Sequence, residues 1–466
     1  MRTTHFNFLA QLIFACLCLP LFVACGSNDS SDGPEKPSTE PETPSEVTVG
    51  PPEGKEVYIP QELRTMDLKN KDSQWYWGRT KATDDVILFW AKGFGDDISK
   101  APSLQGQNMK VDADNLLRKV QEFYDFYYNE LKFVNPGETN ADRYRMMVML
   151  DYSLEGTAYG GTYDNVIGAL WVAPNRVQDE NMNAVAHELG HSFQLQIIAD
   201  GAGAGWGDGF HGFYEMTSQW MLWQVNPDWT SDEYYHFEAF RGLTHKAYLH
   251  LENIYHSPFV IECWGEQHGL PFIANLYREG RNREDVVETY KRLTGVSQEE
   301  FNAEMWHNYA RLVNFDFDRV RSNTRRLTDG WNTQLANLGD GWKRVAKNNA
   351  PENYGFNVIP VTAPEAGATV TVEFRGEAGL EGYVTRNADA AGWRYGFVAV
   401  DSSDNVTYGE MQSDPEGSVS YTLPEGTTLR KLWLVVMGAP TRHWQNNDNS
   451  NVADDAQWPY SIKINY

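Results

Sequence analysis

The chain has 466 residues, a formal net charge of −25 at pH 7 and 41% hydrophobic residues. A chain of this length can bury a large apolar core, so it needs no disulfide framework to fold. The strong negative charge excludes nucleic acid as a partner, because the phosphates would be repelled. It suits a protein that stays soluble at a cell surface.

Residues 1–24 have the composition of an export signal. Arg2 supplies a positive start, residues 8–23 are mostly apolar, and a small residue precedes Cys25. Such a leader is cleaved and is not a transmembrane anchor. The segment resembles a bacterial lipoprotein signal, which implies cleavage before Cys25 and acylation of that cysteine. An ordinary secretory signal is the alternative, and both predict an exported mature protein.

Residues 25–55 consist largely of Ser, Pro, Glu, Thr, Asp and Gly. Such a segment cannot bury apolar surface, so we expect a disordered tether that holds the folded part away from a membrane. Asp29 and Asp32 resemble the acidic signals that direct some lipoproteins to the outer face. The expected location is the bacterial outer membrane, with the lipid on Cys25 and the folded part exposed at the surface.

The first folded domain is expected to span residues 56–325 and to contain a mixed sheet. Residues 86–90 and 146–150 are short apolar runs bounded by turn residues, which predicts two buried strands. Residues 114–132 carry apolar side chains at helical spacing, and residues 166–172 predict a further strand. This order of elements predicts an α+β domain.

Residues 184–191 contain the pattern H-E-x-x-H, with His187, Glu188 and His191. At about 100° per residue, the two histidines lie one turn apart on one helix face, where both rings reach one ion. Glu188 is the candidate general base for a metal-activated water. A surface helix with two solvated histidines is the alternative. The apolar flanks argue against it, and Gly190 inside the helix suggests that another backbone or a substrate approaches closely.

A catalytic zinc site needs a third protein ligand. The best candidate is Glu215, because it opens an apolar run, residues 215–223, that predicts a second helix beside the first. A metzincin would need a histidine at the position of Ile197, so that class is excluded. Three further residues remain rivals of Glu215 as the third ligand: Asp200, Asp208 and His211.

These residues resemble the gluzincin clan of zinc peptidases. The pattern from His187 to His191, followed 24 positions later by Glu215, is similar to the ligand spacing of that clan. Gly190 before the second histidine and Gln194 after it make the pattern more similar still to the enhancin-like, mucin-directed metallopeptidases.

The resemblance implies a zincin-like domain that hydrolyses peptide bonds of proteins or glycoproteins. It implies that Zn²⁺ is held by His187, His191 and Glu215, with Glu188 as the general base. In zincins the edge strand of the sheet binds the peptide backbone by strand addition, and residues 167–172 are the candidate here. The alternative is that this strand is simply part of the core.

Residues 215–317 are expected to stay helical. Gly269 predicts a helix end, and residues 297–300 predict a capping box at the start of another helix. Cys263 lies in an apolar run and is expected to be a buried thiol. The resemblance to gluzincins implies that a histidine or tyrosine of this region stabilises the oxyanion of the tetrahedral intermediate; for any single residue, a structural or surface role is the alternative. The sequence does not distinguish among the histidines His236, His245, His250, His256, His268 and His307.

Residues 335–466 are expected to form a second, all-β domain, with a junction near residues 320–345. Alternating runs separated by turn residues predict a β-sandwich with strands at 369–374, 395–400, 418–423, 432–436 and 460–464. Its aromatic residues either stack on sugars or pack in the core. The candidates for such carbohydrate contact are Trp393, Tyr395, Trp433, Trp444 and Trp458.

The sequence therefore predicts a surface-tethered zinc peptidase with a C-terminal sandwich. The alternative is a non-catalytic glycan- or protein-binding lipoprotein on the same scaffold, with a structural zinc or with its activity lost. The intact Glu188 favours the enzyme, because a purely structural metal site does not need a base.

Overall fold

The structure of the chain is a computed structural model that describes residues 49–466, except 204–205, 207–210 and 446–454. The predicted leader, Cys25 and most of the predicted tether lie outside the described residues. The Arg145 guanidinium donates to the Glu53 carbonyl at 2.6 Å, so residues just before 56 already contact the folded part. Among the helices of the described residues, none is long and apolar enough to cross a membrane.

The first sheet is mixed, and its strand order is β1-β2-β3-β5-β4. Strands β2, β3 and β5 run parallel, whereas β1 and β4 pair antiparallel at the two edges. Every residue of β2 and β3 is buried, as expected for parallel strands covered on both faces. The bounds are β1 (Thr80–Ala82), β2 (Val86–Trp90), β3 (Met146–Leu150), β4 (Ala158–Tyr163) and β5 (Ile167–Val172).

The prediction that residues 167–172 form an edge strand is wrong. Strand β5 pairs with β3 on one side and with β4 on the other, so its backbone groups are used inside the sheet. Within the described residues, the edge strands are β1 and β4, and β4 is the one next to α2. The sequence did not reveal β4, because Gly160 and Gly161 interrupt the alternation that marks a strand.

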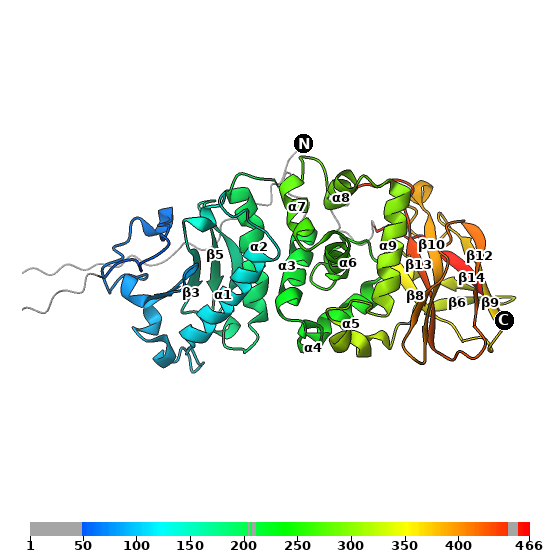
Figure 1. Cartoon of the computed structure of the whole chain (residues 1–466), viewed down its shortest axis with the longest axis horizontal. Helices are drawn as coiled ribbons and strands as arrows, with labels where there is room; N and C mark the ends of the chain where they lie inside the picture. The colour runs from blue at the N-terminus through cyan, green and yellow to red at the C-terminus, as the bar shows by residue number, and fades with distance from the viewer. Residues whose placement is uncertain (1–48, 204–205, 207–210, 446–454) are drawn as a thin grey trace, which may run out of the picture. The chain divides into compact units, whose positions relative to one another are not determined.

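Two long helices pack against this sheet. Helix α1 (Ala113–Asn129) confirms the helix predicted over residues 114–132, and helix α2 (Asn183–Ala199) carries the H-E-x-x-H pattern. Helix α2 contacts β4 and β5, and α1 contacts β1, β2 and α2. The ring of Phe193 on α2 meets Tyr127 of α1 edge-on, with centroids 5.7 Å apart. Figure 1 shows both helices beside β3 and β5.

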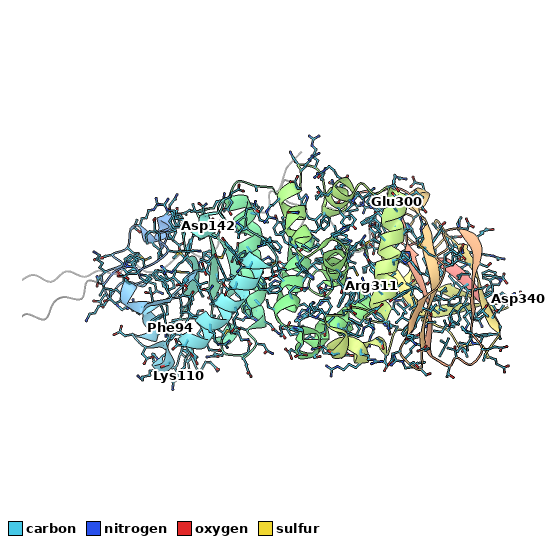
Figure 2. The ribbon with its side chains drawn as sticks, viewed as in Figure 1. Phe94, Lys110, Asp142, Glu300, Arg311 and Asp340 are labelled. Atoms are coloured by element: carbon cyan, nitrogen blue, oxygen red, sulfur yellow. The ribbon has the colours of Figure 1, made fainter. Side chains whose placement is uncertain are left out.

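The chain then stays helical, as predicted. Gly269, with φ 88°, ends α6, and a capping box between Ser297 and Glu300 starts α9. Figure 2 labels Glu300 at the start of α9 and Arg311 further along it. Cys263 is a buried free thiol, and burial raises its pKa. The bounds are α3 (His211–Val225), α4 (Trp229–Asp232), α5 (Tyr234–Leu243), α6 (Phe259–His268), α7 (Pro271–Glu279), α8 (Val286–Thr294), α9 (Gln298–Val313) and α10 (Arg321–Thr324).

The C-terminal part contains two antiparallel sheets, with strand orders β11-β10-β13-β8 and β12-β9-β14-β7-β6. Their facing side chains share one apolar core, in which Phe374 of β9 stacks on Tyr395 of β10 at 4.1 Å. This is the arrangement of a β-sandwich. The bounds are β6 (Leu335–Gly339), β7 (Trp342–Val345), β8 (Phe356–Pro360), β9 (Thr369–Gly376), β10 (Trp393–Asp401), β11 (Val406–Tyr408), β12 (Glu416–Thr422), β13 (Leu429–Gly438) and β14 (Tyr460–Asn465).

Four of the five aromatic residues considered for sugar stacking are buried, three of them in the core of the sandwich and Trp433 in the core shared with the helices. Trp393 and Trp433 are 3% exposed, and Tyr395 and Trp458 are fully buried. Trp444 is half-buried and meets Trp458 edge-on. The four buried rings cannot present a face to a sugar, so the stacking interpretation is wrong for them.

The β11-β10-β13-β8 sheet packs its outer face against α9. The indole nitrogen of Trp306 donates to the Val435 carbonyl at 3.2 Å, and a Cβ on Gly396 would lie 2.7 Å from the Trp306 ring. Among the described residues, the last α-helix, α10, ends at Thr324 and β6 begins at Leu335, within the predicted junction. Independent folding of the parts on either side stays a prediction.

Candidate metal centre

Helix α2 places His187 and His191 together, as their spacing predicts. Their Nε2 atoms are 3.1 Å apart, and the ring planes meet at 86°. His187 is 8% exposed, and His191 is half-buried. The apolar side chains around the pattern are buried, which excludes the surface-helix alternative: Val185, Ala186, Leu189 and Phe193.

Glu215 on α3 completes the group. Its Oε2 atom lies 3.1 Å from Nε2 of His187 and 3.2 Å from Nε2 of His191. One possible ligand atom of each residue lies within 4.8 Å of the other two. The structure therefore brings together the three ligands expected from the sequence.

Helix α3 approaches α2 this closely because Gly190 has no side chain. A Cβ at Gly190 would lie 2.5 Å from Oγ of Ser218 and 3.4 Å from its Cα. The Ser218 hydroxyl donates to the His187 carbonyl and joins the two helices. The predicted close approach at Gly190 is confirmed.

The rival ligands do not join this group in the described residues. The Asp200 carboxylate accepts hydrogen bonds from the Thr139 hydroxyl at 2.6 Å and from the Asn140 amide at 2.9 Å. These bonds fix the C-terminal end of α2 to the preceding part of the chain. Asp208 and the side chain of His211 lie outside what the structure describes.

Two glutamines fix the proton positions on the histidine rings. The Gln219 amide nitrogen donates to the Tyr255 carbonyl at 2.8 Å, so its oxygen lies 2.8 Å from Nδ1 of His187. The Gln194 amide nitrogen donates to a backbone carbonyl of α3 at 3.0 Å, so its oxygen lies 2.9 Å from Nδ1 of His191. An amide oxygen only accepts, so each Nδ1 carries a proton and each Nε2 lone pair is directed at the centre.

Three acceptor atoms therefore converge, and a cation between them is needed to offset their repulsion. That cation is either a proton or a metal ion. Burial opposes the charged form of His191, but the hydrogen bond and charge of Glu215 raise its pKa above the ordinary value. Burial alone would raise the pKa of Glu215, yet its bonds to both histidines hold it low. Two imidazoles and one carboxylate, with both Nδ1 atoms bonded, fit the donor set of a catalytic zinc site.

Glu188 lies beside this group and is held by strand β4. Its Oε2 atom accepts a hydrogen bond from the Gly160 amide at 2.8 Å. A Cβ at Gly160 would lie 1.8 Å from the Glu188 carbonyl oxygen, so only glycine lets β4 approach α2 here. Burial raises the pKa of Glu188, and the charges of the two histidines partly offset that rise. The arrangement therefore places a carboxylate with a raised pKa, which is a stronger base than a free one, next to the three candidate ligands.

The structure adds residues that the sequence did not assign. From the sequence, Gln194 was used only as part of a resemblance and was given no role in the site. Gln219, Gly160 and Tyr255 were not named as site residues. The Tyr255 ring lies 6.1 Å from the His187 ring. Burial raises the pKa of Tyr255 to about 12, and the negative charge of nearby Glu215 adds to the effect. Only Gln194 had a local signal, because it follows His191 by one helical turn.

A second group of potential ligands, His250, Glu352 and Asp455, does not fit a metal site. Nδ1 of His250 accepts from the Glu252 amide at 3.1 Å, so its proton lies on Nε2, which is 3.2 Å from an Asp455 oxygen. The Lys246 ammonium lies 2.6 Å from the other Asp455 oxygen. Lysine therefore supplies the positive charge that a metal would bring.

Comparisons with known proteins place the chain in a family, but they do not identify an activity. No curated protein matches the chain. A solved structure titled "CBM4 structure and function" aligns with 28% of this chain and 74% of its own, at 10% identity and with a TM-score of 0.15. That TM-score is too low to carry a conclusion. A family model matches residues 50–466, so the chain belongs to the family of unknown function DUF6055.

Proposed function

We propose that the chain is an exported zinc-dependent peptidase of the gluzincin type, with a zincin-like catalytic domain. The observation that carries the proposal is the convergence of three acceptor atoms, from His187, His191 and Glu215, while both Nδ1 atoms face fixed acceptors. Such a centre requires a cation, and its ligand set is that of catalytic zinc sites.

The protein's own residues have distinct roles in this proposal. A bound zinc ion would supply a Lewis acid that polarises a carbonyl group and lowers the pKa of a water molecule. Glu188 accepts the proton of that water and later passes it to the leaving amine. The Gly160 amide holds the Glu188 carboxylate in place, and its burial strengthens it as a base.

The proposed substrate is an extended segment of a protein or glycoprotein, bound along the open edge of β4. In an antiparallel pair, alternate residues direct their N–H and C=O groups away from the partner strand. Gly160 is such a residue, because its amide bonds Glu188 instead of β5. A peptide paired to this edge therefore passes next to the general base. Strand β4 replaces the strand expected from the sequence.

The alternative, a non-catalytic glycan- or protein-binding lipoprotein, has less support. Four of the five aromatic candidates for carbohydrate contact are buried, so they do not offer a surface on which a sugar could stack. Glu188 lies where a general base is needed, which favours the enzyme.

The proposal includes a lipid anchor on Cys25, which would attach the protein to the bacterial outer membrane. The leader ending at this cysteine and the polar segment after it support the anchor. Replacing Cys25 by Ala should move the protein from the membrane fraction to the soluble fraction. A variant that stays as firmly bound as the wild type would show that another anchor exists.

The catalytic proposal is tested with purified protein and a panel of proteins and glycoproteins. The wild type should cleave at least one substrate, and Glu188→Gln should lose cleavage while it keeps its zinc. Glu155→Gln, which changes an exposed glutamate in the same way, is the matched control and should stay active. Undiminished cleavage by Glu188→Gln would contradict the assigned base.

A further inference from the structure

Tyr255 contacts the candidate metal centre in two ways. Its backbone carbonyl accepts the hydrogen bond that orients Gln219, and Gln219 in turn orients His187. Its hydroxyl lies close enough to Glu215 for the charge of that carboxylate to help raise the pKa of Tyr255, and its ring tilts against His187 with centroids 6.1 Å apart. Tyr255 thus orients His187 through the Gln219 amide and lies beside a second candidate ligand, Glu215.

Tyr255 belongs to a short segment, residues 244–257, whose other end is bonded to the sandwich. The Phe356 amide donates to the Thr244 carbonyl, and the Glu352 amide donates to the His245 carbonyl at 2.9 Å. A Cβ at Gly355 would lie 2.1 Å from the His245 carbonyl oxygen, so the two backbones touch. We call residues 244–257 the linking segment.

Asp455 of the sandwich binds two side chains of the linking segment. It lies 2.6 Å from the Lys246 ammonium and 3.2 Å from Nε2 of His250. Side-chain exposure is 10% for Lys246, 0% for His250 and 8% for Asp455. The Glu352 and Glu252 carboxylates lie farther from the Lys246 ammonium, at 3.9 and 4.0 Å. Asp455 is therefore its nearest partner, and removing this buried partner takes away a contact that constrains where the segment lies.

Local hydrogen bonds stiffen the linking segment between His250 and Tyr255. The His250 ring accepts from the Glu252 amide and caps the short helix η8 (Leu251–Asn253). The His256 amide and the Ser257 hydroxyl both donate to the Asn253 carbonyl. A displacement at His250 therefore reaches Tyr255 through a few residues with little freedom to absorb it.

We propose that Tyr255 is a positioning residue for the metal ligands and that the C-terminal sandwich holds it there through the linking segment. The inference rests on the proposed metal centre. It assigns the sandwich a role in the site that is separate from substrate binding. Outer residues that orient metal ligands affect metal affinity by about 10- to 100-fold when they are changed.

The first experiment measures the zinc dissociation constant of the full-length protein by competition with a chromogenic chelator. Tyr255→Phe removes the hydroxyl but keeps the ring and the carbonyl, and it should weaken zinc binding by about tenfold. Tyr234→Phe is the matched control, because this partly exposed tyrosine lies on α5 and contacts Phe237. Equal zinc affinity of Tyr255→Phe and the wild type would overturn the role of Tyr255.

The second experiment tests the link from the sandwich. Asp455→Asn should weaken zinc binding by about threefold or more while the near-ultraviolet circular dichroism stays native. Lys246→Gln removes the other partner of the same ion pair and replaces Asp455→Asn in the experiment if that variant does not fold. The matched control is Glu377→Gln, which breaks an ion pair with Arg344 inside the sandwich. Wild-type zinc affinity in a folded Asp455 or Lys246 variant would overturn the link.

The wild-type measurement separates this inference from the proposed function. A wild type that binds no zinc contradicts the metal centre itself. A wild type that binds zinc, with variants of Tyr255 and Asp455 that bind it equally well, contradicts only the positioning role. In the Tyr255→Phe, Asp455→Asn double variant, an effect smaller than the product of the two single effects supports one shared route. If the fold loss of zinc affinity in the double variant equals the product of the two single losses, the two contacts act independently. That result would overturn the route through the linking segment.

Discussion

The amide oxygen of Gln194 lies 2.9 Å from Nδ1 of His191. Both residues are on α2, and His191 precedes Gln194 by about one helical turn. The amide nitrogen of Gln194 donates a hydrogen bond to a backbone carbonyl of α3, and this bond keeps the amide oxygen turned toward His191. This contact holds the His191 ring with its Nε2 atom toward Glu215. Gln194 therefore joins the two helices and orients a candidate ligand with one side chain.

Replacing Gln194 by Leu should lower zinc affinity by about 10- to 100-fold, because the His191 ring loses its orienting acceptor. Gln194→Glu should bind zinc better than Gln194→Leu, because a carboxylate still accepts from Nδ1–H, but it loses the donor to the α3 carbonyl and should lower the melting temperature. Chelator competition at neutral pH measures both constants. Equal affinity of Gln194→Leu and the wild type would show that the ring is oriented without this contact.

Gly160→Ala should destabilise the protein by roughly 1–3 kcal/mol and weaken any hydrolysis, because the new methyl group meets the backbone of α2. The nearest atom would be the Glu188 carbonyl oxygen at 1.8 Å. Gly161→Ala is the matched control, since its nearest neighbours are ring atoms of Tyr159 and Trp171 at 3.0 and 3.3 Å. Thermal unfolding measures both variants. Similar melting temperatures would contradict the close packing of β4 on α2.

Glu352→Gln should stabilise the protein at alkaline pH. Burial, followed by the charge of Asp455, raises the pKa of Glu352 from 4.5 to about 8. Between these values only the unfolded state ionises, so this group lowers stability by roughly 1 kcal/mol per pH unit as the pH rises, and the loss levels off above the folded pKa. Melting curves at pH 5 and pH 9 should show a gain for Glu352→Gln at pH 9 only. An equal change at both values would contradict the shifted pKa.

Helix α2 and the centre on it could be predicted because their signals are local. His187 and His191 are separated by one turn, and the apolar flanks indicate burial within the same segment. Glu215 needed one further inference, that a second apolar helix packs beside the first. The fully apolar strands β2 and β3 were equally visible, since every one of their residues is buried.

The features of the fold and the site that could not be predicted from the sequence depend on contacts between distant segments. Gln219 and Tyr255 reach His187 only after α3 and the linking segment have packed on α2. Strand β4 is defined by its pairing and by Gly160, not by an apolar pattern. In the sandwich, alternation predicted the strands but not which aromatic side chains turn inward. Trp393 and Trp458 therefore looked available for a ligand although both lie in the core.

The central claim is that His187, His191 and Glu215 bind zinc while Glu188 acts beside them. The most direct measurement is the zinc content and zinc affinity of purified full-length wild type, Glu215→Ala and Glu188→Gln, determined by elemental analysis and chelator competition. The account predicts one zinc per chain in the wild type and in Glu188→Gln, and a strong loss of affinity in Glu215→Ala, because only the last change removes a ligand. Wild-type zinc affinity in Glu215→Ala, or no bound zinc in the wild type, would contradict it.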